Sequence, residues 1–267
     1  MAKIIAPNTK GNTLSTSPKV QVNELNLTEF MVILDPGHGG LNPYRWSNTS
    51  QYTTFPAKAF QHRKVMPLPG ETKPQVFMGN GWFFEGVWNR WLVLEVRTML
   101  KTLGVPFWDV ADSYKDISLK DRVILANRLA KAHKHTLYVS SHANASATHL
   151  ARGYEVYSSP GDTASDAIAE WHWQWTAKLF GDKLKMRADV QDGDHDREAR
   201  FYVLTQTKMP AILVEHLFFD NIHDAHLLMR EDVRQAFAYA QVCTILQFIQ
   251  KRYNVNLIFP EPPKLNF

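Results

Sequence analysis

The chain has 267 residues, of which 45% are hydrophobic and 21% charged, and its 30 Lys and Arg against 26 Asp and Glu give a net charge of +4. This is ordinary globular composition in a chain long enough to bury one substantial core. The positive excess is mild and no basic run or basic helical face accompanies it, so the sequence predicts no nucleic-acid partner.

The chain gives no sign of export or of insertion into a membrane. Its first ten residues lack the apolar core of a signal peptide, and no later run reaches membrane-spanning length. The single cysteine, Cys243, lies in an apolar stretch typical of a buried helix, so no intrachain disulfide can form. We therefore expect a monomer that is made in the cytoplasm without a signal peptide and has no membrane partner.

The first part of the chain contains one clear strand and one long irregular region. Residues 1–29 are polar and rich in turn-forming residues, and they predict a flexible N-terminal arm. The apolar run 31–34 ends at Asp-Pro-Gly, which predicts a strand buried on both faces. Residues 41 to about 84 hold many prolines, glycines and aromatic residues, and this pattern predicts a large loop insertion.

Helical and extended segments alternate after the insertion. A helix over 85–103 is stopped by Gly104. A second helix, over 118–132, begins with Ser118 as its N-cap. We expect further helices over 163–180 and 224–252, a charged loop over 181–199, and extended segments over 105–108, 137–141, 153–157, 201–204 and 211–214.

This alternation predicts one α/β domain over residues 30–253, followed by a Pro-rich C-terminal tail over 254–267. The expected sheet is twisted and mostly parallel or mixed, with helices on both faces. In open sheets of this kind, ligands gather beyond the carboxyl ends of the strands. Three predicted strands end in metal-binding or acid–base side chains, which are His38, His142 and Glu215.

Glu85 occupies an unusual position in the helix that it begins. It shares one stripe of that helix with Asn89, Leu92 and Val96, so its carboxylate faces the core. A core-facing carboxylate is costly unless it is paired, hydrogen-bonded or bound to a metal. Two imidazoles and one carboxylate, with water as the fourth ligand, form the standard open site of catalytic zinc. Glu85 and the two histidines therefore predict a site for one divalent ion, with Glu215 as the acid–base that assists the water.

Four segments, in this order along the chain, resemble the zinc-dependent N-acetylmuramoyl-L-alanine amidases with a type-3 catalytic domain. They are Ile-Leu-Asp-Pro-Gly-His-Gly-Gly at 33–40, Glu85, Ser-Ser-His-Ala-Asn-Ala at 140–145, and Pro-Ala-Ile-Leu-Val-Glu at 210–215 with Asn221 beyond. The resemblance runs from residue 31 to about 250. It implies a phosphorylase/hydrolase-like α/β fold and one Zn²⁺ per chain, bound by His38, Glu85 and His142. It also implies Glu215 as the catalytic acid–base and peptidoglycan as the partner, cut between N-acetylmuramic acid and L-alanine.

The chain departs from the family pattern in two places. Residues 39–84 separate the first histidine from the metal-binding glutamate, where the family usually has a short connection. His216 and Leu217 follow Glu215, where the family commonly has Gly-Phe. These departures bear on substrate recognition and leave the predicted metal site intact.

Four side chains are candidates for contacts with the substrate. Tyr44 and Trp46 lie in the insertion, where they suit a glycan groove together with the other aromatic residues Tyr52, Phe55 and Phe60. Asn144 belongs to the second histidine motif, and Arg200 precedes the segment 201–204. The acidic loop 192–196, Asp-Gly-Asp-His-Asp, could bind a second cation, but its composition favours a solvated loop.

These features predict a phage-type endolysin, a lytic enzyme that reaches the cell wall after release from the cytoplasm, with a bacterial autolysin as the nearest variant. Two other hypotheses stay open. One is a non-catalytic protein that binds peptidoglycan or regulates a partner, but the chain retains all four site residues. The other is a zinc carboxypeptidase-like muropeptide hydrolase, which would produce different new ends.

Overall fold

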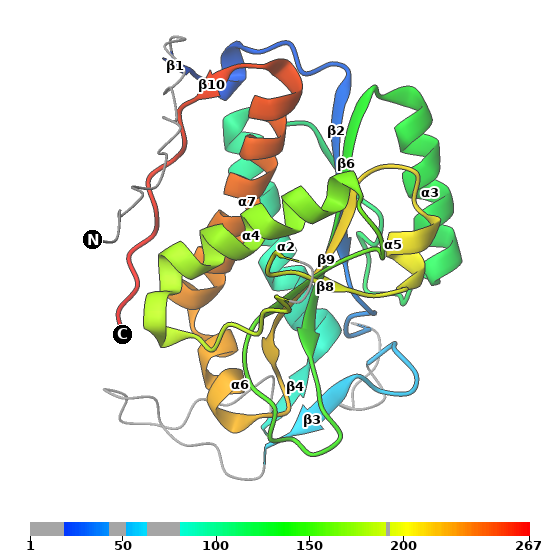
Figure 1. Cartoon of the computed structure of the whole chain (residues 1–267). Coiled ribbons are helices and arrows are strands. Elements are labelled where there is room, and N and C mark those ends of the chain that lie inside the picture. The colour runs from blue at the N-terminus through cyan, green and yellow to red at the C-terminus, as the bar shows by residue number, and fades with distance from the viewer. Residues whose placement is uncertain (1–18, 43–51, 63–80, 191–192) are drawn as a thin grey trace, which may run out of the picture.

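The apolar runs of the sequence become the central strands of a six-stranded sheet in the computed structural model, which describes residues 19–42, 52–62, 81–190 and 193–267. Among these residues the strand order is β5-β2-β6-β9-β7-β8, and Figure 1 labels β2, β6, β9 and β8 of this sheet. The strands are β2 (Phe30–Pro36), β5 (Phe107–Asp109), β6 (His135–Asn144), β7 (Glu155–Ser158), β8 (Arg197–Glu198) and β9 (Ala211–Phe218).

The sheet is mixed, and its register brings the predicted site residues to one edge. Strands β5, β2, β6 and β9 are parallel, whereas β7 runs antiparallel to β9. His142 on β6 is the register partner of Glu215 on β9, and Glu215 is in turn the partner of Glu155 on β7. The predicted mixed α/β sheet is therefore confirmed, and the carboxyl ends of β2, β6 and β9 lie together as expected.

Helices cover both faces of the sheet, as predicted. One face packs against α2 (Glu85–Leu103), α4 (Ala164–Phe180) and α7 (Glu231–Tyr253), and the other against α3 (Leu119–Ala132) and α5 (Tyr202–Gln206). Gly104 ends α2 with a left-handed φ of 72°, and the side chain of Ser118 caps α3 by accepting the backbone N–H of Asp121 at 3.1 Å. None of the described helices has the length and apolarity that a bilayer span requires.

Three segments differ from the predicted elements. The charged loop expected over 181–199 contains the 3-10 helix η2 (Gly181–Lys183) and the edge strand β8. Residues 201–204 were expected to be extended, but 202–206 form the short helix α5. Only Val203 and Leu204 are buried there, while Phe201 and Tyr202 stay exposed. A four-residue apolar run does not distinguish strand from helix, and this pairwise burial follows a helical turn rather than the alternation of a strand. The helix expected over 224–252 is two helices, α6 (Ile222–Met229) and α7, separated at Arg230.

The chain ends contribute to the packed structure. In the part of the expected arm that the structure describes, β1 (Lys19–Val20) pairs in parallel with β10 (Asn256–Leu257) of the tail, and η1 (Val22–Glu24) follows it. Val22 and Leu27 are buried in the main core. The described parts of the expected insertion include β3 (Ala59–Gln61) and β4 (Trp82–Phe84), which pair antiparallel and lead directly into α2.

Helix α4 carries a buried histidine on its core-facing side. His172 is 0% exposed, and its Nδ1 is 2.6 Å from the hydroxyl of Tyr154, with which it hydrogen-bonds. Its Nε2 has no hydrogen-bond partner among the described residues. Burial lowers the pKa of His172 to about 3, because the charged imidazolium would have to leave water. His216 on β9 interacts with it electrostatically, and burial lowers the pKa of His216 to about 3 as well.

We expect His172 to make the protein less stable in acid. An imidazole whose pKa is lower in the folded than in the unfolded chain takes up a proton on unfolding, so its contribution to stability is complete above about pH 6.5 and is lost as the pH falls toward 3. The free energy of unfolding, measured with urea at about pH 7 and about pH 4.5, should therefore fall less in His172→Gln than in the wild type. The exposed His223→Gln is the control and should behave as the wild type; an equal acid loss in His172→Gln would contradict the prediction.

Candidate active site

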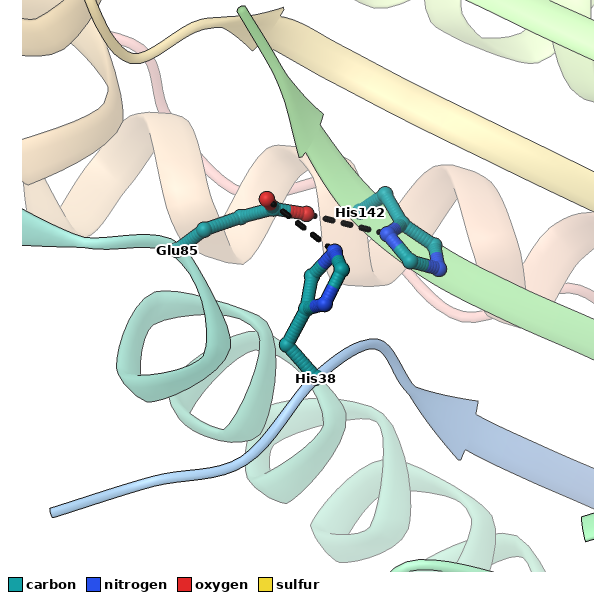
Figure 2. Close-up of side chains that lie close together, drawn as sticks. All are labelled: His38, Glu85 and His142. Atoms are coloured by element: carbon teal, nitrogen blue, oxygen red, sulfur yellow. Dashed lines mark hydrogen bonds and ion pairs between the residues drawn. The ribbon is translucent and has the colours of Figure 1, made fainter. Parts of the chain in front are cut away.

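Three side chains from distant parts of the sequence meet at the carboxyl edge of the sheet. His38 follows β2, Glu85 begins α2, and His142 lies near the end of β6. Their ligand-type atoms all lie within 4.8 Å of one another, so they could hold a metal ion. Figure 2 shows the Glu85 carboxylate facing both imidazoles, with Oε2 at 3.2 Å from Nε2 of His38 and Oε1 at 2.9 Å from Nδ1 of His142.

Two glycines allow the backbone to approach these side chains closely. A Cβ at Gly37 would lie 2.1 Å from Cε1 of the His142 ring, and a Cβ at Gly86 would lie 2.0 Å from the carbonyl oxygen of Gly39. Real Cβ atoms do not approach so closely, and the loop after β2 can lie against β6 and α2 only because these residues are glycines. His38 itself has a left-handed φ of 61°, an uncommon conformation outside glycine.

A buried ion pair holds the loop that carries His38. Asp35 on β2 pairs with Arg122 of α3, and its other oxygen accepts hydrogen bonds from Tyr138 and Ser140, both at 2.7 Å. The Arg122 guanidinium also donates to the carbonyls of Pro36 at 2.8 Å and of His38 at 3.0 Å. Burial alone would raise the pKa of Asp35, but the charge of Arg122 and these hydrogen bonds hold it below its usual value.

Removing Arg122 is expected to destabilise the fold. Arg122→Met leaves the Asp35 carboxylate buried without its counter-charge, which costs about 3–5 kcal/mol of unfolding free energy. The double variant Asp35→Asn with Arg122→Met should recover part of this loss, because no uncompensated charge remains. Urea unfolding measures the free energy of unfolding of the single and the double variant. Arg128→Met, at an exposed position of the same helix, should stay within about 0.5 kcal/mol of the wild type. A loss below about 1 kcal/mol in Arg122→Met would contradict the prediction.

Glu85 is a buried anion between two imidazoles. It is 3% exposed, and Asn89, one turn along α2, donates to its Oε1 at 3.4 Å and to the carbonyl of Gly37 at 3.1 Å. Burial acts to raise the pKa of Glu85, but the neighbouring His38 and His142 outweigh it and lower the pKa to about 2. The carboxylate is thus ionised at neutral pH and leaves the site ready to bind a cation.

Glu215 lies beside this group in a cleft of about 500 Å³ that His38 and His142 also line. Its Oε2 is buried and has no hydrogen-bond partner among the described residues. Burial, followed by the charges of Glu85 and Glu155, raises the pKa of Glu215 well above its usual value. A carboxyl group with a raised pKa next to a cluster of metal-type ligands is suited to accept and return a proton.

The structure describes two of the four residues that were expected to contact the substrate. Asn144 does not line the cleft; its side-chain amide donates to Glu155 at 2.7 Å. Arg200 is exposed and lines a separate pocket near Thr163 and Lys208. Tyr44 and Trp46 lie outside the described residues. The cleft therefore contains neither of the two candidates that the structure describes.

Further residues line the cleft. Phe55 was among the aromatic residues of the insertion that were expected to suit a glycan groove, whereas Lys58, and Phe201 and Tyr202 at the start of α5, were not singled out from the sequence. Phe55 is 95% exposed, and the charge of Lys58 acts on Glu215. The aromatic composition of the insertion was the only sequence signal for such residues, and it did not distinguish Phe55 from its neighbours.

Comparisons with known proteins bear on the family of this chain. A family model described as N-acetylmuramoyl-L-alanine amidase matches residues 32–247. The chain is 28% identical over 246 residues to N-acetylmuramoyl-L-alanine amidase LytC of Bacillus subtilis (strain 168). The aligned region covers 87% of this chain and 43% of LytC. It is 31% identical over 150 residues to an endolysin of Bacillus phage SPP1. Here the aligned region covers 55% of this chain and 52% of the endolysin.

The chain thus spans about half the length of the curated relatives that it matches. Among solved structures, N-acetylmuramoyl-L-alanine amidase AmiC2 of Nostoc punctiforme superposes with a TM-score of 0.60 at 26% identity, which covers 83% of this chain and 98% of that one.

Proposed function

Because the chain belongs to the N-acetylmuramoyl-L-alanine amidase family, we propose that it hydrolyses the amide bond between N-acetylmuramic acid and L-alanine in peptidoglycan with one Zn²⁺ per chain. The observation that carries the proposal is the convergence of His38, Glu85 and His142, from three distant segments, beside a cleft that also contains Glu215. His38, Glu85 and His142 are the proposed metal ligands, and Glu215 is the proposed acid–base.

The donor set fits zinc. Two imidazole nitrogens and one carboxylate are the ligands of an open catalytic zinc site, whereas a structural site has four protein ligands. The buried charge of Glu85, which lies within 3.2 Å of both imidazoles, also calls for a positive partner, and a bound metal ion supplies one. Bound there, Zn²⁺ would supply a Lewis acid that polarises the amide carbonyl and makes a water molecule acidic enough to attack.

Glu215 is the residue that moves the proton. Its Oε2 faces no donor among the described residues, so it is available to accept a proton from the attacking water. The same carboxyl group then gives the proton to the nitrogen of L-alanine as the amide bond breaks. The raised pKa of Glu215 favours this sequence, because a more basic carboxylate takes a proton from the attacking water more readily and keeps it until the nitrogen leaves.

The rim of the cleft suits a glycan. Exposed Phe55, Phe201 and Tyr202 present aromatic rings along it, and such rings offer flat apolar surfaces on which a sugar can lie. We propose these three residues as substrate contacts in addition to those predicted from the sequence.

The new ends in digested peptidoglycan test the proposal. Purified protein incubated with sacculi and Zn²⁺ should release stem peptides with a free L-alanine amine and leave the lactyl carboxyl of the sugar intact, as mass spectrometry of the products would show. Free peptide carboxyl termini without new L-alanine amines would instead point to a carboxypeptidase. Sacculi that stay undigested with Zn²⁺ present would refute the proposed activity.

We further propose that the enzyme is lytic, in the manner of an endolysin. Similarity to the SPP1 endolysin supports this role, while similarity to LytC supports the autolysin variant. Cells that express the protein should lose turbidity only when a pore-forming agent breaches the membrane. Lysis at the same rate without that agent would contradict the endolysin role.

A further inference from the structure

A second cluster of ionisable side chains plays no part in the proposed hydrolysis. It surrounds a pocket of about 240 Å³, here called the acidic pocket, whose lining residues are Ser158, Asp162, Asp166, Asp194, Asp196 and Glu198. No Lys, Arg or His is among these lining residues, although the chain carries a net charge of +4. Five carboxyl groups therefore converge where no cationic side chain balances them.

The acidic pocket is built from three elements of the domain. Ser158 ends β7, Asp166 lies in the first turn of α4, and Glu198 lies on β8. Strand β8 directs its side chains alternately, so that Arg197 pairs with Glu155 at 3.3 Å whereas Glu198 lines the acidic pocket. The one basic residue of this strand thus points away from the five carboxyl groups.

Asp196 points into the acidic pocket with an unsatisfied oxygen. The residue is 2% exposed, and its Oδ1 has no hydrogen-bond partner among the described residues. The Ser158 hydroxyl and the Asp194 carboxyl group are both within hydrogen-bonding reach of its side chain. A buried carboxylate oxygen without a donor is costly, and two ionised carboxyl groups in contact repel each other. Either a proton or a cation must accompany this pair.

A cation satisfies the rest of the cluster better than a proton does. A single proton can neutralise only one of the two neighbouring carboxylates of Asp194 and Asp196. Such a proton leaves the charges of Asp162, Asp166 and Glu198 in place, although Asp166 accepts hydrogen bonds from Thr163 and Glu198 accepts one from the backbone N–H of Gly161. A divalent ion would offset two of these charges and bring Oδ1 of Asp196 a partner.

We propose that the acidic pocket is a Ca²⁺ site in which Asp194 and Asp196 are the central ligands. All the lining side chains offer oxygen and none offers nitrogen or sulfur, which selects a hard cation. Ca²⁺ tolerates irregular sets of six to eight oxygens, whereas Mg²⁺ demands a near-ideal octahedron, and a pocket assembled from a loop, a helix end and an edge strand suits the former. The ion would fasten the loop that carries Asp194 to β7 and α4.

Calcium titration of the purified full chain tests this proposal. The chain is freed of divalent metal with a chelator and returned to chelator-free buffer. Titration calorimetry should then show a single saturable Ca²⁺-binding event. At a Ca²⁺ concentration of about 100 times the dissociation constant, Tm should rise by roughly 5–10 °C. Asp196→Asn and Asp194→Asn should each lose most of this response, and both should still unfold cooperatively.

Two control variants separate this site from other acidic residues. Asp182→Asn removes a carboxylate that is 90% exposed and lies outside the acidic pocket, and it should keep the full Ca²⁺ response. Glu85→Gln should also keep it, because the readout is binding and Tm rather than hydrolysis, so the result does not depend on the proposed amidase activity. A wild type without a saturable response, or an unchanged response in Asp196→Asn, would overturn the proposal. An equal response to Mg²⁺ would overturn the assignment to Ca²⁺.

Discussion

Glu215→Gln should lower the rate of peptidoglycan hydrolysis by roughly 10²–10⁴-fold, the usual contribution of a general acid–base. Glutamine has nearly the shape of glutamate but cannot take a proton from water or return it to the leaving nitrogen. Glu215 lies in the cleft beside His38 and His142 but is not one of the three clustered ligand-type residues. The variant should therefore bind as much Zn²⁺ as the wild type. Release of soluble muropeptides gives the rate, and elemental analysis gives the metal content.

Lost activity together with retained zinc would distinguish a role in proton transfer from a role in metal binding. Glu231→Gln, at an exposed position at the start of α7, removes the same charge far from the cleft residues and should leave both quantities unchanged. Because burial and two carboxylates already disfavour the charged form of Glu215, its neutral replacement should unfold at a denaturant concentration no lower than the wild type. A variant with wild-type activity would exclude Glu215 as the acid–base.

Glu85→Gln should remove both the metal and the activity. The carboxylate is the only anionic group among the three clustered ligands, and its two oxygens lie at 3.2 Å from His38 and 2.9 Å from His142. Outer-shell partners of a zinc ligand contribute about 10–100-fold in metal affinity, so loss of a ligand should cost at least about 10²-fold. Competition with a zinc-sensitive dye measures the affinity, and hydrolysis of sacculi at micromolar Zn²⁺ should be undetectable.

A second carboxylate on the same helix provides the matched control. Glu95→Gln removes the charge that pairs with Arg234 at 3.3 Å, two turns or more from Glu85 along α2, and should keep wild-type zinc affinity. High concentrations of Zn²⁺ should restore part of the activity of Glu85→Gln if its fold is intact, and circular dichroism would report that fold independently. Stoichiometric zinc at wild-type affinity in Glu85→Gln would remove the basis of the proposed metal site.

The elements that the sequence predicted well are those with a strong local signal. The helix over 85–103 has an apolar stripe and a glycine stop, and the strands near His38, His142 and Glu215 are continuous apolar runs. Parallel strands end at one edge of a sheet, so residues that follow three such runs were expected to meet without knowledge of the fold. The short segment 201–204 lacked such a signal, and its helical structure depends on packing against its neighbours.

The substrate side of the site could not be predicted in the same way. Asn144 is one residue past Ala143 in a strongly patterned strand, yet its amide is held by Glu155, a residue of a neighbouring part of the sheet. Phe55 and Lys58 line the cleft from an irregular segment whose position no local periodicity specifies. No sequence motif predicted that Arg122 on α3 would donate a hydrogen bond to the carbonyl of His38.

The amino-acid sequence by itself determined the chemistry available to this protein: two histidines and two glutamates placed at the ends of buried elements, because hydrophobic periodicity and turn residues act within a few positions along the chain. Only the tertiary structure decided which of the remaining polar side chains face the cleft and which are taken up by one another. That choice depends on contacts between segments far apart in sequence, such as Asp35 with Arg122 or Asp196 with Ser158, whose strength comes from burial that no single segment contains.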